Sequence, residues 1–191
     1  MQKNIGIILK KNNYTKEKIS ILDASIGRIE AIIRSPHAPL LHHGTFFSYS
    51  STITYKDSYI LTDIEIIHTP FHVARENIYF LHHILELCYY FLPLHNEQKS
   101  IFELVKKTIL YPIENKLLLL FRFFTLIGFY PENLPFEKSY FLRLLSYPLE
   151  TILKEKLDEA QLKMLESWLL QCIEMHPEKK KFKTMYINKK I

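Results

Sequence analysis

The spacing of apolar residues changes at Thr69-Pro70, and this change restricts the folds open to the chain. Before it, short runs alternate apolar and polar residues, a period of two that is typical of strands with one buried face. After it, apolar residues recur every three to four positions, as in residues 74–92 and 158–176, which is the helical period. The sequence therefore predicts an α+β protein, with a strand domain first and a helical domain second.

Five short strands are predicted before residue 70. Gly, Pro, Asn and Asp lie between the runs, and the fourth run is rich in β-branched and aromatic residues. So many strands in so short a segment favour a closed barrel of the oligonucleotide-binding (OB) type, because closure removes exposed sheet edges. The predicted strands are residues 6–10, 18–23, 28–33, 45–55 and 59–67.

The helical domain is predicted to assemble around the most apolar run of the chain, residues 117–128. Leu and Phe occupy nearly every face of this run, so we expect it to be buried. It is shorter than the roughly 20 residues of a membrane-spanning helix and contains Arg122, which argues against a membrane protein. Gly128 favours the left-handed conformation that ends many helices. We expect three parts: residues 1–70, 71–178 and a lysine-rich tail at 179–191.

Charge is distributed unevenly along the chain. Residues 1–70 carry eight Lys and Arg against six Asp and Glu, and residues 71–178 carry eleven against fourteen. The tail carries six lysines and no acidic residue. Basic ends around an acidic middle are consistent with a polyanionic partner, but also with a tail that only keeps the terminus soluble.

The sequence contains no pattern typical of an enzyme or of a metal site. It lacks a Gly-rich phosphate loop, a nucleophile elbow and a His-Glu-x-x-His motif. Cys88 and Cys172 lie far apart in helical patterns, so we expect buried free thiols in a reducing cytoplasm. His82 and Glu86 have the spacing of two metal ligands, but no third ligand follows. We therefore expect no catalysis, no metal and no cofactor.

Several segments, in their order along the chain, resemble the RecO family of recombination and repair mediators. Leu22-Asp-Ala-Ser-Ile-Gly-Arg28 is similar to a family strand that leads into a Gly-Arg pair, and Leu126-Ile-Gly-Phe-Tyr-Pro131 is similar to its Leu-Leu-Gly-Tyr-x-Pro segment. The chain departs from the family in its shorter length and in lacking a four-cysteine zinc site. The resembling segments are residues 6–11, 14–18, 22–28, 59–65, 78–87, 126–131 and 182–186.

The resemblance implies binding of single- and double-stranded DNA, annealing of complementary strands, and help to RecA, together with RecR, in displacing single-strand-binding protein. It also implies a nucleoid-associated, cytoplasmic protein. The family binds the acidic C-terminal tail of single-strand-binding protein through its helical domain. Such a tail needs a cation beside an apolar pocket, and our candidates are Lys116, Leu117 and Phe121.

The candidate DNA-binding residues are mostly cations at the ends of the predicted strands. These ends could converge on one rim of the barrel, where cations would follow a phosphate backbone. The candidates are Lys10, Lys11, Lys16, Lys18, Arg28, Arg34 and His37. Phe46, Phe47, Tyr49, Tyr55 and Tyr59 could offer stacking faces, although alternation sends roughly half of these rings into the core.

Two features weaken the DNA-binding hypothesis. The loop after the third strand carries His37, His42 and His43 where the family is rich in Lys and Arg, and a neutral imidazole neutralises no phosphate. We expect these histidines to gain charge, and DNA binding to tighten, as the pH falls to about 6. The acidic helical domain also fits an alternative: a protein-interaction adaptor that keeps the fold but binds DNA weakly.

Overall fold

The computed structural model describes residues 3–11, 18–34, 40–53, 58–111, 113–130, 138–148, 151 and 154–183. It divides into two compact units, residues 1–112 and 113–191. The change from strands to helices lies at residues 69–71, where the sequence predicts it, but the first two helices belong to the same unit as the strands.

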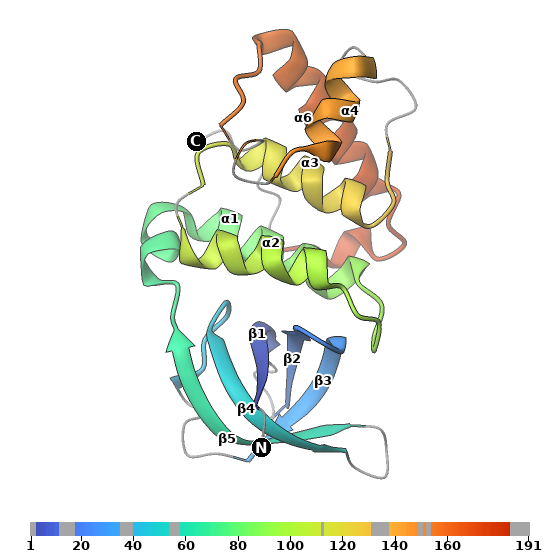
Figure 1. The fold of residues 1–191 in the computed structure, drawn as a ribbon. Coiled ribbons are helices and arrows are strands. Elements are labelled where there is room, and N and C mark those ends of the chain that lie inside the picture. The colour runs from blue at the N-terminus through green and yellow to red at the C-terminus, as the bar shows by residue number, and fades with distance from the viewer. Residues whose placement is uncertain are drawn as a thin grey trace. The chain divides into compact units, whose positions relative to one another are not determined.

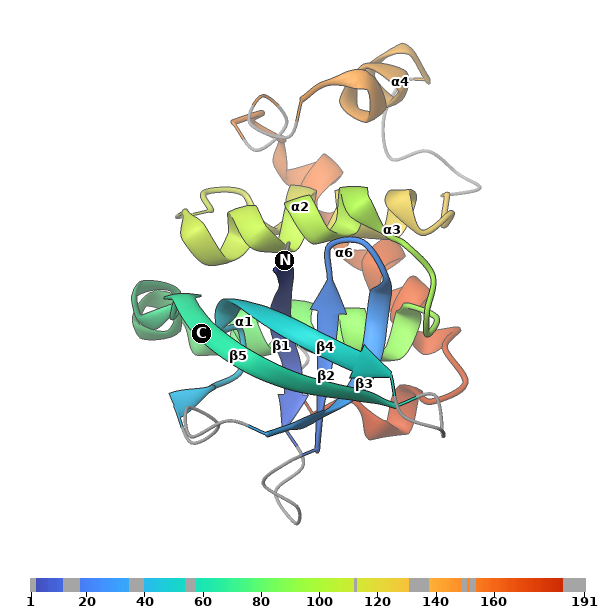
Figure 2. The same ribbon diagram turned by 60° about the horizontal axis from the view of Figure 1, so that its bottom comes forward.

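The first unit contains a closed five-stranded barrel with the strand order β1-β2-β3-β5-β4 (Figures 1 and 2). β3 and β5 pair in parallel, and every other neighbouring pair is antiparallel. This arrangement is an OB-fold, so the predicted α+β class and barrel are confirmed. The strands are β1 (Asn4–Lys11), β2 (Lys18–Asp23), β3 (Gly27–Ile33), β4 (Phe46–Ile53) and β5 (Tyr59–His68).

The barrel interior is filled by side chains that alternate along the strands. Each strand contributes β-branched, Leu or aromatic residues to it, as the period of two predicts. The inner residues are Ile8, Ile19, Ile21, Ile29, Ala31, Ile33, Leu41, Phe47, Tyr49, Tyr59, Leu61 and Ile64. The pairing register shifts between Ile8 and Lys10 in β1, which interrupts the alternation there.

Part of the outer face of the barrel is also buried. Ile7 on β1 and Leu22 on β2 point outward, yet both are fully buried. α1 (Phe71–Phe91) contacts β1 and packs beside α2 (Lys99–Leu110), as Figure 1 shows. Phe46 of β4 contributes to the same packing, with its ring centroid 6.3 Å from that of Phe102 on α2. These two helices therefore share a second apolar core with the barrel.

The second unit is built on α3 (Lys116–Leu126), the buried helix that the sequence predicts. Asn115 caps its N-terminus by accepting a hydrogen bond of 3.1 Å from the Leu118 N–H. Gly128 ends it with a φ of 92°, which confirms the expected left-handed cap. α4 (Lys138–Ser146), α6 (Glu159–Glu174) and the short 3₁₀ helix η2 (Lys179–Lys181) complete the unit in its described part.

Aromatic packing joins α3 to α6 within this unit. The centroid of the Trp168 ring lies 5.5 Å from that of Phe121 and 6.2 Å from that of Phe124. Arg122, the single charge in the apolar run, donates a 2.5 Å hydrogen bond to the Leu145 carbonyl of α4. Among the described residues, no helix combines the length and the apolar character needed to cross a membrane.

Candidate nucleic-acid interface

The outer surface of β1, β2 and β3 carries a cluster of charged residues. Lys10 pairs with Ser20, and Ser20 pairs with Glu30, so their side chains lie in one row across the three strands. Lys18 and Arg28 lie on the same face in the rows on either side, because side chains two positions apart share a face. We call this surface the cationic face: Lys10, Lys18 and Arg28, with Ser20 and Glu30 between them.

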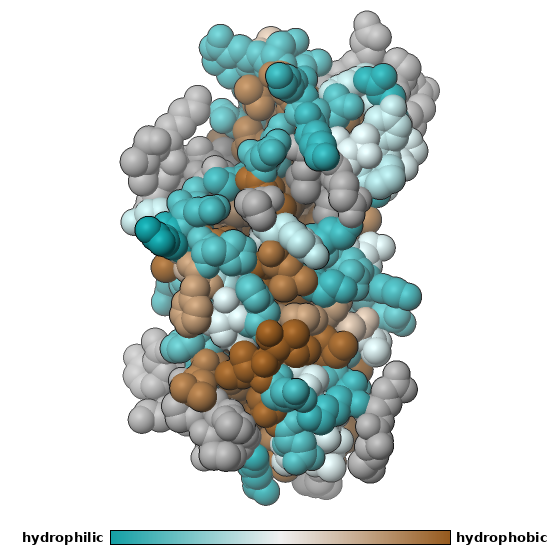
Figure 3. All heavy atoms as spheres, turned by 60° about the vertical axis from the view of Figure 1, so that its left-hand side comes forward, coloured by the Kyte–Doolittle hydropathy of each residue, from teal (hydrophilic) through white to brown (hydrophobic). Residues whose placement is uncertain are grey.

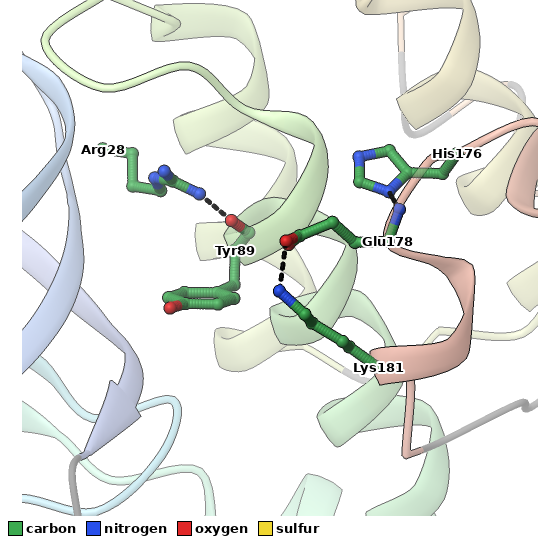
Figure 4. Close-up of polar contacts among 5 residues, drawn as sticks. All are labelled: Arg28, Tyr89, His176, Glu178 and Lys181. Atoms are coloured by element: carbon green, nitrogen blue, oxygen red, sulfur yellow. Dashed lines mark hydrogen bonds and ion pairs between the residues drawn. The ribbon is translucent and has the colours of Figure 1, made fainter.

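The C-terminal end of α1 borders the cationic face. The Lys10 Nζ lies 4.2 Å from the centroid of the Tyr89 ring and 6.0 Å from that of Tyr90. The Arg28 Cζ lies 5.2 Å from the centroid of Tyr89, and the Arg28 Nη1 donates to the Tyr89 carbonyl (Figure 4). A cation over an aromatic face is stabilised by the ring quadrupole, so Tyr89 holds both cations in place.

The segment after α1 fixes the position of Arg28 further. Arg28 and Leu94 form an isolated parallel bridge, and the His95 N–H donates a 2.9 Å hydrogen bond to the Arg28 carbonyl. Arg28 therefore joins β3 to α1 through both its backbone and its side chain. This structural role leaves Lys10 and Lys18, both exposed, as the more accessible cations of the face.

Glu30 is an acidic residue within this basic surface. Partial burial raises the pKa of its carboxyl above the ordinary value, even though the side chain reaches solvent. The Ser20 hydroxyl and the nearby cations Arg28, Lys10 and Lys18 oppose this effect and lower the pKa. The cationic face therefore contains a carboxyl that is easier to protonate than an ordinary glutamate.

The predicted convergence of all six cations on one rim does not hold. Arg28 is the second residue of β3 and Arg34 follows the end of this strand, so about 20 Å of strand separates them. Lys11 points away from the cationic face, and its Nζ donates a 3.0 Å hydrogen bond to the Leu41 carbonyl. Lys16 and His37 lie outside the described residues.

His43 is placed differently from the exposed, chargeable loop residue that the sequence suggests. Its Nε2 accepts a 3.3 Å hydrogen bond from the Lys11 N–H, and its ring centroid lies 5.3 Å from that of His82 on α1. Burial, followed by the charges of His82 and Lys11, lowers the pKa of His43. His43 therefore stays neutral at a pH where an exposed histidine is already charged.

Most of the aromatic residues proposed for base stacking belong to the core. Phe46, Phe47, Tyr49 and Tyr59 are all buried, and Tyr55 lies outside the described residues. Alternation would expose some of these rings, but α2 covers the outward-facing Phe46. The aromatic residues that do border the cations, Tyr89 and Tyr90, lie on α1. Sequence analysis missed them because nothing in the helical pattern links them to β1 or β3.

The candidate residues of the second unit are partly accessible. Phe121 is fully buried against Trp168, whereas Lys116 and Leu117 at the start of α3 are half-buried. In the tail, Lys179 and Lys180 are exposed, and Lys181 forms an ion pair with Glu178 (Figure 4). The Glu178 N–H donates to the His176 Nδ1, which fixes the turn that carries these lysines.

Among the described residues, the cysteines and histidines form no recognisable reactive centre. Cys88 and Cys172 are buried free thiols, as predicted. Across the described residues, no group of three or more His, Cys, Asp or Glu side chains is placed to hold a metal ion.

Comparison with known proteins adds no family to this description. No family model matches the chain, and no curated protein matches it in sequence.

Proposed function

We propose that this chain is a non-catalytic DNA-binding protein of repair and recombination, acting as RecO-like mediators do. The observation that carries the proposal is the cationic face on an OB-fold barrel. OB-folds bind oligonucleotides on the outer surface around strands 2 and 3. Here that surface carries Lys10 and Lys18, and Tyr89 of α1 borders it. Cations beside aromatic rings are the combination used for single strands without sequence preference.

The mechanism we propose needs charge and position but no reaction. Lys10 and Lys18 neutralise phosphates of a bound single strand, and neutralised strands repel a complementary strand less. Annealing then follows from holding one strand extended while the second pairs with it. By resemblance to RecO, we extend the proposal to double-stranded DNA, to RecR, and to the C-terminal tail of single-strand-binding protein. Lys116 and Leu117 are the residues we propose for that tail.

The test is the salt dependence of binding to a fluorescein-labelled oligothymidine, followed by fluorescence anisotropy. For single strands, each neutralised phosphate contributes about −0.7 to the slope of log K against log salt. The double variant K10A/K18A should therefore flatten the slope by roughly 1.4. K3A/K106A is the matched control, because it removes the same charge from lysines that pair with Glu65 and Glu103. Equal slopes for both double variants would contradict the proposal.

The alternative is an adaptor that has lost DNA affinity. Two observations favour it: Arg28 is engaged by α1, and Glu30 places a negative charge within the cationic face. Figure 3 also shows a patch of exposed apolar side chains. Among the barrel strands, β4 exposes Ile53 and β5 exposes Ile67. Large apolar patches often mark contacts with other proteins. Oligothymidine binding that is absent even at low salt would favour the adaptor.

A further inference from the structure

Glu30 is the residue of the cationic face whose charge opposes the proposed function. Its partner in the row is Ser20, which in turn pairs with Lys10, so the carboxyl lies within reach of the same ligand atoms as the Lys10 ammonium. Lys18 is one row away on β2, and Arg28 precedes Glu30 by two positions on β3. A phosphate backbone that contacts Lys10 and Lys18 must therefore pass close to Glu30.

We infer that Glu30 is a built-in electrostatic brake, a carboxylate that competes with DNA phosphates for Lys10 and Lys18 and so limits affinity. This inference rests on the proposed DNA-binding function. Within the described part of the chain, Glu30 forms no ion pair with these cations, so none of them neutralises its charge at contact distance. It also lies on the outer face and not in the barrel core, so its charge is not needed to hold the fold.

Protonation should release the brake. The raised pKa of Glu30 means that its carboxyl becomes neutral at a higher pH than an exposed glutamate does. The groups that face it are Lys10 on β1, Lys18 on β2 and Arg28 on β3. Acid cannot remove a proton from an ammonium or a guanidinium group. Lowering the pH therefore removes the single negative charge of this set and leaves the cations in place.

The experiment compares wild type with E30Q in oligothymidine binding at low salt, followed by fluorescence anisotropy. Gln keeps the shape of Glu and its ability to hydrogen-bond Ser20, but it removes the charge. We expect E30Q to bind about fivefold more tightly, since two unit charges about 4 Å apart in water interact by that factor. The gain should shrink as salt is added, because exposed charges are screened.

The control is E76Q, which removes the same charge from an exposed residue near the opposite end of α1. It should bind as wild type does. A second arm lowers the pH from about 7: wild type should gain affinity that E30Q already has, so the difference between them should narrow, and at a higher pH than an exposed glutamate would give.

Three outcomes decide between the hypotheses. The inference is supported if wild type binds the oligothymidine, E30Q binds it more tightly, and E76Q binds it as wild type does. If wild type binds but the affinity of E30Q is equal to that of wild type or lower, the inference about Glu30 is wrong and the proposed function still stands. Weaker binding would mean that Glu30 orders the lysines instead of competing for them. Absence of binding by wild type and E30Q alike overturns the proposed function and the brake together. Far-UV circular dichroism establishes that each variant is folded.

Discussion

The Tyr49 hydroxyl donates a 2.6 Å hydrogen bond to the Oδ2 of Asp23 inside the barrel, where both residues are buried. The other carboxylate oxygen of Asp23 accepts the N–H groups of Ser25 and Ile26, each at 2.8 Å. One buried side chain thus fixes the β2–β3 turn and ties it to β4. Burial raises the pKa of Tyr49, and the neighbouring carboxylate raises it further, so the hydroxyl remains a donor.

Replacing Tyr49 by Phe should destabilise the first unit by about 1.5–3 kcal/mol, the usual contribution of a hydrogen bond to a charged group. The ring still fills the core, so the loss comes from the hydrogen bond and from leaving the buried Asp23 carboxylate without one donor. Urea unfolding followed by far-UV circular dichroism measures it. Y111F serves as the control, because Tyr111 is 61% exposed at the end of α2 and should cost little. A change in Y49F no larger than in Y111F would contradict this role.

Gly27 should tolerate no side chain. Its φ is 84°, and an added Cβ would lie 1.8 Å from the Asn96 carbonyl oxygen. Positive φ alone costs a non-glycine residue about 1–3 kcal/mol, and the clash adds to this because backbone must move. Gly128 has a φ of 92° and open space around the position of an added Cβ, so G128A measures the cost of the positive φ without a clash. Calorimetry should show a larger loss of stability for G27A than for G128A, and equal losses would contradict the clash.

The barrel could be predicted from the sequence because its constraints are local. A period of two places Ile19 and Ile21 inward, and the Asp23–Gly27 segment supplies the turn residues between β2 and β3. The association of α1 and α2 with the barrel could not be predicted this way. It depends on apolar outward residues such as Ile7 and Leu22, whose partners lie far along the chain. The available sequence signal for this packing was a strand with apolar residues on both of its faces.

The candidate site was predicted only in part. Lys10 and Lys18 were found because they lie at predicted strand ends, and they do share a face. Arg28 was also named, but its link to the Tyr89 carbonyl depends on tertiary packing that no local pattern contains. Glu30 was missed although its signal was present: in β3 it lies two positions from Arg28, which a period of two places on the same face.

The N-terminus of α6 should depend on its capping box. Asp158 accepts a 2.8 Å hydrogen bond from the Gln161 N–H, and the Gln161 Oε1 accepts one of 3.0 Å from the Asp158 N–H. D158A should destabilise the second unit by about 0.5–2 kcal/mol, whereas D158S keeps an acceptor and should lose little. Fluorescence of Trp168, the chain's only tryptophan, reports on this unit during urea unfolding. Equal losses in both variants would argue against the cap.

The first unit should lose stability in mild acid through His43. Because burial lowers its pKa in the folded protein, the unfolded chain binds the proton more readily, at about pH 6.5. The stabilising contribution is therefore complete above about pH 6.5 and is lost as the pH falls towards the lower folded pKa.

In H43Q the amide oxygen can still accept a hydrogen bond from the Lys11 N–H but cannot titrate. The drop in unfolding temperature from about pH 7.5 to pH 5 should therefore be smaller in H43Q than in wild type. H42Q removes only one of the weaker charges that act on His43, so it should alter the pH dependence of thermal unfolding, followed by circular dichroism, less than H43Q does. Identical pH dependence in wild type and H43Q would show that His43 is not the titrating group.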